Sequence, residues 1–214
     1  MAYGDVRAVV FDMDGTLIDS TSCVTAAYRD AVLAAGGEEY TANEVVALYP
    51  KGPPRTILGL LLRRVATPRD ERLYLDALQR HRSSIAVYDG VIDVLEMLVA
   101  ASVPIAVFTG ASSTAARQLL ADAGLVDFFA FVLGSDAVTR PKPAPDGILR
   151  ACALLAVAPV NAAYVGDSPL DLEAARRSGA LAIAAGWGHL FDPTANSDLV
   201  AMSPREVLQC LKAM

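Results

Sequence analysis

Two aspartates stand two positions apart at the end of a short apolar run. Asp12 and Asp14 follow the run at 8–11 and precede a Gly-Thr turn. Residues two apart on a strand or its extension point the same way, so both carboxylates are expected to face one spot. They repel each other there unless a cation lies between them or one keeps its proton. Both conditions suit phosphoryl transfer, in which a metal-held carboxylate attacks and a protonated neighbour delivers a proton.

Two further apolar runs end in a group that could take part in such chemistry. The run at 105–108 is followed by Thr109 and Gly110, and the run at 162–165 leads to Asp167. Ligands of open α/β sheets bind outside the carboxyl ends of the strands, so these groups are expected to gather near the first aspartate pair. Three carboxylates without histidines favour a hard cation, and Mg²⁺ is the natural one. The hydroxyl of Thr109 and the backbone N–H groups freed by Gly110 could form an anion site at the start of the next helix, whereas Thr109 taken alone fits an ordinary N-cap or turn residue.

A lysine in a proline-rich loop supplies the positive charge that a phosphate needs. Lys142 is flanked by prolines at 141, 143 and 145, which hold the segment extended. A solvated surface lysine is the alternative, but a braced one favours phosphate binding. Asp171, four residues after Asp167, is assigned a supporting role. It is expected to hydrogen-bond a metal-bound water or to pair with Lys142.

Alternating helical and strand patterns after residue 86 predict the scaffold. The expected strands are 8–11, 105–108, 129–133, 162–165 and 181–184, with a possible short one at 199–200. Strands alternating with helices indicate an α/β fold with a doubly wound, mainly parallel sheet. The first crossover is far longer than the roughly thirty residues that such a unit takes. Its surplus has helical periodicity, which predicts a core of 1–19 and 86–214 and an inserted all-helical cap of 20–85.

Composition narrows the class of protein and its partners. The chain has 214 residues, of which 54% are hydrophobic, a net charge of −6 and a mean hydropathy of +0.39. The acidic balance argues against nucleic acid or an anionic membrane as partner. No apolar run has the length of a membrane span, and the wide spacing of the three cysteines argues against disulfides and structural zinc. A cytoplasmic protein, monomeric or homodimeric, is expected.

These motifs, in this order, resemble the haloacid dehalogenase superfamily. They are the Asp12 to Thr16 segment, Thr109-Gly110, Lys142 in a Lys-Pro-x-Pro-Asp loop, and Gly166-Asp167 followed by Asp171. Within the superfamily the chain is most similar to the phosphoglycolate-phosphatase-like and β-phosphoglucomutase-like branch, which carries an α-helical cap on a Rossmann-like core.

The resemblance implies a role for each motif residue. Asp12 would be the nucleophile that forms an aspartyl-phosphate, and Asp14 the acid that protonates the leaving alkoxide and then the base that activates water. Mg²⁺ would bind the side chains of Asp12 and Asp167 and the backbone carbonyl of Asp14. Thr109, Gly110 and Lys142 would hold the phosphoryl oxygens, which matches the need of a highly charged transition state for positioned positive charge.

The substrate and the rival functions remain open at the level of sequence. Tyr49, Lys51 and Arg55, beside a Gly-Pro-Pro turn, are the candidate specificity residues of the cap, although exposed charges with no such role are equally compatible. A closing cap implies a small phosphorylated metabolite. The first alternative is a phosphomutase that uses the same nucleophile. The others are a receiver-like signalling domain, which is shorter and uncapped, and a phosphate-binding protein without activity.

Overall fold

A six-stranded parallel sheet forms the centre of the molecule. The computed structural model describes residues 5–212. Residues 1–4 of the predicted core segment 1–19, and residues 213–214 of the predicted core segment 86–214, lie outside the described residues. The strand order is β5-β4-β1-β6-β7-β8, and every pairing is parallel. The chain order runs outward from β1 in both directions, so the switch point lies beside β1. The strands are β1 (Ala8–Phe11), β4 (Ile105–Phe108), β5 (Val132–Leu133), β6 (Ala162–Gly166), β7 (Leu181–Ala185) and β8 (Leu199–Ala201).

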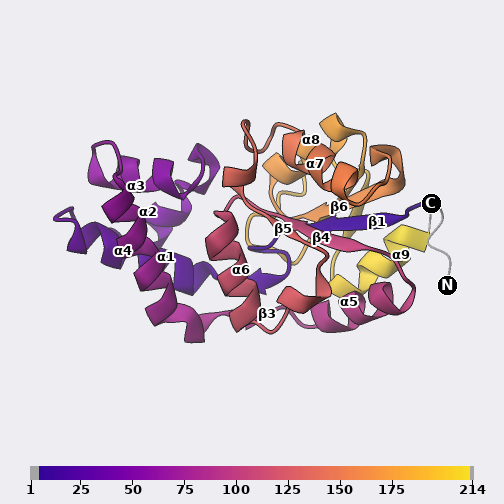
Figure 1. Ribbon diagram of the computed structural model, residues 1–214, viewed down its shortest axis with the longest axis horizontal. Helices are drawn as coiled ribbons and strands as arrows, with labels where there is room; N and C mark the ends of the chain where they lie inside the picture. The colour runs from indigo at the N-terminus through magenta and orange to yellow at the C-terminus, as the bar shows by residue number, and fades with distance from the viewer. Residues whose placement is uncertain (1–4, 213–214) are drawn as a thin grey trace.

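Helices cover both faces of this sheet. Helices α5 (Val91–Ala100), α6 (Ser113–Asp122) and α9 (Val207–Lys212) pack on one face, and α7 (Asp146–Leu154) and α8 (Pro169–Ser178) on the other (Figure 1). Strand β1 shows why its run is apolar throughout: Val9 and Phe11 join one core cluster and Val10 joins the other. A parallel strand buried on both faces needs apolar residues at successive positions. The predicted doubly wound α/β fold is confirmed.

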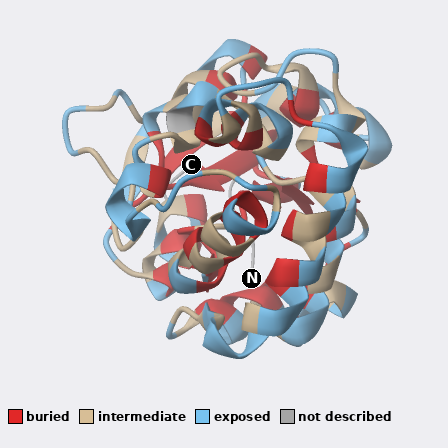
Figure 2. Cartoon of the chain, turned by 90° about the vertical axis from the view of Figure 1, so that its left-hand side faces the viewer, coloured by how far each residue is buried: buried red, intermediate tan, exposed pale blue. Residues whose placement is uncertain are grey.

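The surplus in the first crossover is a helical unit at one end of the sheet. It contains α1 (Thr21–Ala34), α2 (Ala42–Val46), α3 (Pro54–Leu62) and α4 (Pro68–His81), and it lies on the left in Figure 1. Thr41 and Thr67 begin α2 and α4 with reciprocal capping boxes. Figure 2 looks onto this end: buried residues face inward, and exposed ones cover the outer side of the helices.

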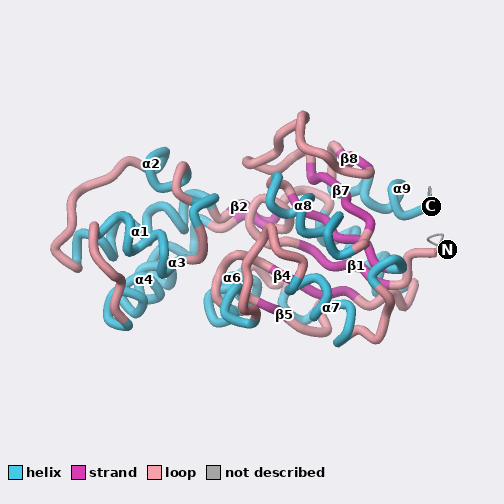
Figure 3. Tube along the Cα trace, turned by 90° about the horizontal axis from the view of Figure 1, so that it is seen from above, coloured by secondary structure: helices cyan, strands magenta, loops and turns pink. Residues whose placement is uncertain are grey.

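A two-stranded ribbon joins the helical unit to the sheet, and it was not predicted. Strands β2 (Ile18–Asp19) and β3 (Ala86–Val87) pair antiparallel where the chain leaves the sheet region and returns to it (Figure 3). Two-residue strands carry no periodicity from which they could be recognised. The boundaries proposed at 19/20 and 85/86 fall at this ribbon, and the division into two domains stays a prediction.

The remaining elements are short 3₁₀ helices, and one strand is shorter than predicted. Only Val132–Leu133 of the expected strand 129–133 is regular, because a 3₁₀ turn at Val126–Phe128 ends immediately before Phe129. No helix between residues 5 and 212 is long and apolar enough to cross a membrane. The other 3₁₀ helices are Tyr49–Lys51, Arg82–Ser84, Ser135–Ala137, Pro159–Asn161 and Pro204–Glu206.

Candidate active site

Three neighbouring strands end at the same edge of the sheet, and each delivers one polar residue there. Asp12 follows β1, Thr109 follows β4 and Asp167 follows β6. The ladders continue into these residues: the N–H of Asp12 donates to Val165 O at 2.8 Å, and that of Thr109 to Leu133 O at 3.0 Å. All three polar side chains are buried. The backbone therefore fixes their positions before any side-chain contact is considered.

Lys142 reaches this edge from its proline-rich loop. Its Nζ lies 2.7 Å from Asp12 Oδ1 and 2.5 Å from Asp171 Oδ1, and only 10% of its side chain is exposed. The ammonium also stands over the rings of Phe108 and Tyr164, 5.4 and 5.8 Å from their centroids. Burial by itself lowers the pKa of Lys142, but the two adjacent carboxylates outweigh it and raise that pKa above its usual value. Lys142 is therefore a buried, permanently charged cation.

Both carboxylate oxygens of Asp171 already accept hydrogen bonds. Oδ1 faces Lys142 and lies 3.0 Å from the Tyr164 hydroxyl, while Oδ2 accepts from the Ser168 N–H at 3.1 Å and from its hydroxyl at 2.5 Å. These last contacts are the capping box that begins α8. Asp171 thus holds Lys142 in place, which is one of the two supporting roles expected for it.

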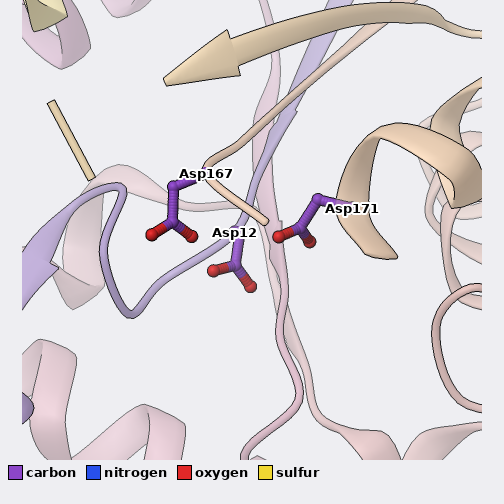
Figure 4. A group of neighbouring side chains, drawn as sticks. All are labelled: Asp12, Asp167 and Asp171. Carbon is purple, nitrogen blue, oxygen red and sulfur yellow. The ribbon is translucent and has the colours of Figure 1, made fainter. Parts of the chain in front are cut away.

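The carboxylates of Asp12, Asp167 and Asp171 form a cluster that could hold a cation. One oxygen from each lies within 4.8 Å of the others. Figure 4 shows Asp12 between the other two, with Asp171 projecting from α8. Asp167 Oδ2 accepts from the Leu190 N–H at 2.9 Å, but the buried Oδ1 has no hydrogen-bond partner among the described residues. An unpaired buried carboxylate oxygen is costly unless a cation binds it, so Asp12 and Asp167 fit Mg²⁺.

The electrostatics of the cluster also favour a bound cation. Burial raises the pKa of Asp12 well above its usual value, against the opposing effect of Lys142. Burial, then the charge of Asp171, raises the pKa of Asp167 to about 7. Both shifts mean that nearby positive charge does not balance the negative charge of the carboxylates, because Lys142 is shared between two of them.

Glycines make room for Asp167. A Cβ on Gly15 would lie 2.2 Å from Asp167 Oδ2, and one on Gly188 would lie 2.2 Å from Asp167 Cβ. Gly15 also has a φ of +80°, a conformation that other residues rarely adopt. The Gly-Thr turn after the aspartate pair is thus required both for its backbone and for the approach of Asp167.

Asp14 lies apart from this cluster and contacts the beginning of the helical unit. The hydroxyl of Ser20, the residue before α1, donates to Asp14 Oδ1. Ser20 occupies the N-cap position without capping the helix, since its hydroxyl is directed to Asp14. Burial raises the pKa of Asp14, with the Ser20 hydrogen bond acting in the opposite direction. A carboxyl that keeps its proton more readily is suited to act as an acid near neutral pH.

A cavity of about 330 Å³ opens between the helical unit and the carboxyl end of the sheet. Such a volume is at the lower end of the range of about 300–1,000 Å³ for small-molecule sites. Of the predicted cap residues, Tyr49 lines this cavity, whereas Lys51 and Arg55 are not part of its lining. Arg55 instead pairs with Glu71 at 3.3 Å. The predicted core residues that line it are Asp12, Asp14, Thr109, Gly110, Lys142, Asp167 and Asp171.

Several residues around the cavity were missed or left unassigned from sequence. Ser168 and Asp171 carry a Ser-x-x-Asp pattern, so their capping box could have been recognised. Tyr164 gave no signal, because a tyrosine inside an apolar strand is indistinguishable from core. His189 lines the cavity, with Nδ1 3.9 Å from Asp167 Oδ2, but its Gly-rich turn has no pattern from which that position follows.

The chain belongs to the haloacid dehalogenase-like hydrolases. The model of that hydrolase family matches residues 6–179, which include all the motif residues on which the resemblance rests. The predicted family and the predicted enzyme class are thereby confirmed: the protein is a hydrolase with the doubly wound core and the carboxylate–lysine site described above.

Its relatives include phosphatases of nearly the same length. The chain is 33% identical to a phosphoglycolate phosphatase of Chromobacterium violaceum, over 97% of each chain. It is 29% identical to an N-acetylmuramic acid 6-phosphate phosphatase of Pseudomonas aeruginosa, over 96% of this chain and 95% of that one. The crystal structure of CbbY from Rhodobacter sphaeroides, in complex with phosphate, superposes with a TM-score of 0.85 at 22% identity, over 94% and 96% of the two chains. This last likeness shows the shared fold.

Proposed function

We propose that the protein is a Mg²⁺-dependent phosphatase that hydrolyses a small phosphorylated metabolite through an aspartyl-phosphate on Asp12. The observation that carries the proposal is the convergence of Asp12, Lys142 and Asp167 on one cavity, with Lys142 Nζ 2.7 Å from Asp12 Oδ1. The names of the phosphatase relatives point to the same chemistry.

In the first step an oxygen of Asp12 attacks the phosphorus of the ester. The bond from phosphorus to the ester oxygen breaks, and the leaving alkoxide takes the proton of the Asp14 carboxyl. The raised pKa of Asp14 supports this role, because the group must hold a proton when the substrate binds. Lys142 and the Thr109 hydroxyl would bind the phosphoryl oxygens, where positive charge stabilises the transition state most.

In the second step water attacks the phosphorus of the aspartyl-phosphate. Its proton passes to the Asp14 carboxylate, the bond from phosphorus to Asp12 breaks, and inorganic phosphate leaves. The site returns to its starting state, with Asp12 ionised and Asp14 protonated.

Asp12 and Asp167 would hold Mg²⁺, together with the backbone carbonyl of Asp14. When bound, the ion neutralises phosphate charge and keeps the nucleophile ionised. The residues of the helical unit, proposed as a cap of 20–85, exclude water from the cavity, and Tyr49 is its specificity candidate. Ser20 positions Asp14 from the point where that unit begins.

Phosphate release from para-nitrophenyl phosphate tests the proposal. We expect release that depends on Mg²⁺ in the wild type and falls to background in Asp12→Asn. Asp127→Asn is the matched control, an aspartate in the 3₁₀ turn at 126–128, away from the cavity lining, and it should retain activity. Activity that persists in Asp12→Asn, or that needs no divalent cation, would refute the proposed function.

A further inference from the structure

The cavity has two walls of different chemical character. Its acidic and basic lining residues all come from the sheet side: four aspartates, Lys142 and His189. The helical unit contributes Ser20, Val24, Ile57, a Gly-Pro-Pro turn and three tyrosines, none of which is acidic or basic in this sense. The leaving group of a phosphate ester held at Asp12 must lie against this second wall, because the phosphate occupies the first.

No cation of the helical unit faces the cavity among the described residues. Arg55, on α3, pairs with Glu71 and lies outside the lining, and Lys51 is exposed and also lies outside it. On the sheet side, Lys142 already contacts two carboxylates, and His189 Nδ1 lies 3.9 Å from Asp167 Oδ2. A carboxylate on the leaving group would therefore lose its water without gaining a cation of its own, which is strongly unfavourable.

The uncharged wall offers aromatic surface and the hydroxyl of Tyr49. The rings of Tyr28 and Tyr74 stack with their centroids 4.4 Å apart. The Tyr49 hydroxyl is buried and finds no hydrogen-bond partner in the part of the chain that the structure describes. A hydroxyl or carbonyl on the substrate would satisfy it, and leaving it unpaired has a cost.

We propose that the physiological leaving group is a neutral alcohol with an apolar or aromatic face and one hydrogen-bonding group, and that it carries no carboxylate. The inference rests on the proposed phosphatase function and specifies its substrate class. It separates this protein from an enzyme for phosphoglycolate, whose leaving group, glycolate, carries a carboxylate.

Three benzylic phosphates of matched reactivity test the inference. Benzyl phosphate, 4-(hydroxymethyl)benzyl phosphate and 4-carboxybenzyl phosphate present the same primary ester with a neutral, a hydroxyl-bearing or an anionic remote end. We expect kcat/KM for the carboxylate to be about 10²-fold below that of the hydroxymethyl compound, a discrimination of the size that an unpaired buried group produces. Phosphoglycolate should also be poorer than benzyl phosphate.

Three variants locate the discrimination. Tyr49→Phe should lower the hydroxymethyl-to-benzyl ratio of kcat/KM about tenfold. Val24→Lys places an ammonium on the uncharged wall, and it should raise the carboxybenzyl-to-benzyl ratio of kcat/KM at least about tenfold. Val24→Met, of similar length without charge, should leave that ratio as in the wild type.

The outcomes distinguish this inference from the function on which it rests. Asp12-dependent hydrolysis that is equal or better for 4-carboxybenzyl phosphate and phosphoglycolate overturns the inference alone. If the wild type prefers the carboxylate substrates and Arg55→Gln or Lys51→Gln loses this preference, the replaced residue is the cation that binds the carboxylate. This result would also overturn the inference. Absence of Asp12-dependent hydrolysis for every ester overturns the phosphatase function, and the inference with it.

Discussion

Replacing Lys142 by methionine removes the one lysine that compensates the buried carboxylates. The methionine keeps a similar length and stays apolar, so packing against Phe108 and Tyr164 should survive. The loss is then electrostatic: Asp12 and Asp171, whose side chains are 7% and 2% exposed, lose the cation that they share. Removing one member of a buried ion pair costs about 3–5 kcal/mol. We expect a decrease of that size in the free energy of unfolding at pH 8 without Mg²⁺.

The decrease should become smaller at low pH. A carboxyl whose pKa is raised in the folded state stabilises the fold below its unfolded pKa, and this contribution is lost as the pH rises through the folded pKa. The pKa of Asp12 is already raised by burial, and without Lys142 it rises further. At pH 5 the carboxyl of the variant can take up a proton and relieve the repulsion. Mg²⁺ should restore part of the stability at pH 8 by mass action.

Urea denaturation of both proteins at pH 5 and pH 8, with and without Mg²⁺, measures these differences. Lys212→Met, at an exposed position on α9, is the control and should show no change. Activity gives a second readout: kcat should fall about 10²–10³-fold in Lys142→Met, the usual effect of deleting a donor to a developing anion. Equal stability of the wild type and the Lys142 variant at pH 8, together with unchanged kcat, would refute the account of this lysine.

Three further predictions concern the acid, the metal ligand and the helical unit. Asp14→Asn should slow the hydrolysis of alkyl phosphates about 10²–10⁴-fold. The same variant should still release a rapid burst of nitrophenolate from para-nitrophenyl phosphate, because that leaving group needs no proton. Equal losses for both substrates would contradict the acid role. Gly15→Ala should weaken Mg²⁺ binding about 10–100-fold in a calorimetric titration, because its Cβ meets the carboxylate of Asp167. Gly124→Ala has a similar positive φ but no neighbour within 4 Å, and it should bind Mg²⁺ normally. Asp70→Asn should destabilise the fold at neutral pH, because the arginine paired with Asp70 and its capping bonds lower the pKa of that carboxyl. The difference in melting temperature should begin to shrink below about pH 4, the pKa of an unfolded aspartate, and vanish only as the pH falls through the lower pKa of the folded state; a difference that does not shrink with acid would show otherwise.

Much of the fold follows from local patterns in the sequence. The run at 8–11 is apolar at every position because both faces of β1 are covered, and that pattern is visible without the structure. The capping boxes at Thr41 and Thr67 likewise act within a few residues of themselves. The β2–β3 ribbon could not be predicted, since its two short strands are held by each other across some seventy residues and not by any local pattern.

Some residues of the candidate site can be predicted from the sequence, and others cannot. Asp12, Thr109 and Asp167 are predictable because each is the first polar residue after a strand, and the parallel sheet brings strand ends together. Tyr164 could not be predicted as a site residue, because its hydroxyl contacts Lys142, which lies in a loop without regular secondary structure. The placement of Lys51 and Arg55 outside the cavity depends on how α3 packs, which the composition of one turn does not determine.

The most direct test of the account is the identity of the covalent intermediate. Enzyme quenched in acid during turnover would be reduced with borohydride, which converts an aspartyl-phosphate to homoserine, and then mapped by peptide mass spectrometry. We predict homoserine at position 12, only with both substrate and Mg²⁺ present. Reduction at another carboxylate, or turnover at full rate without any reducible acyl phosphate, would contradict the claim that Asp12 accepts the phosphoryl group.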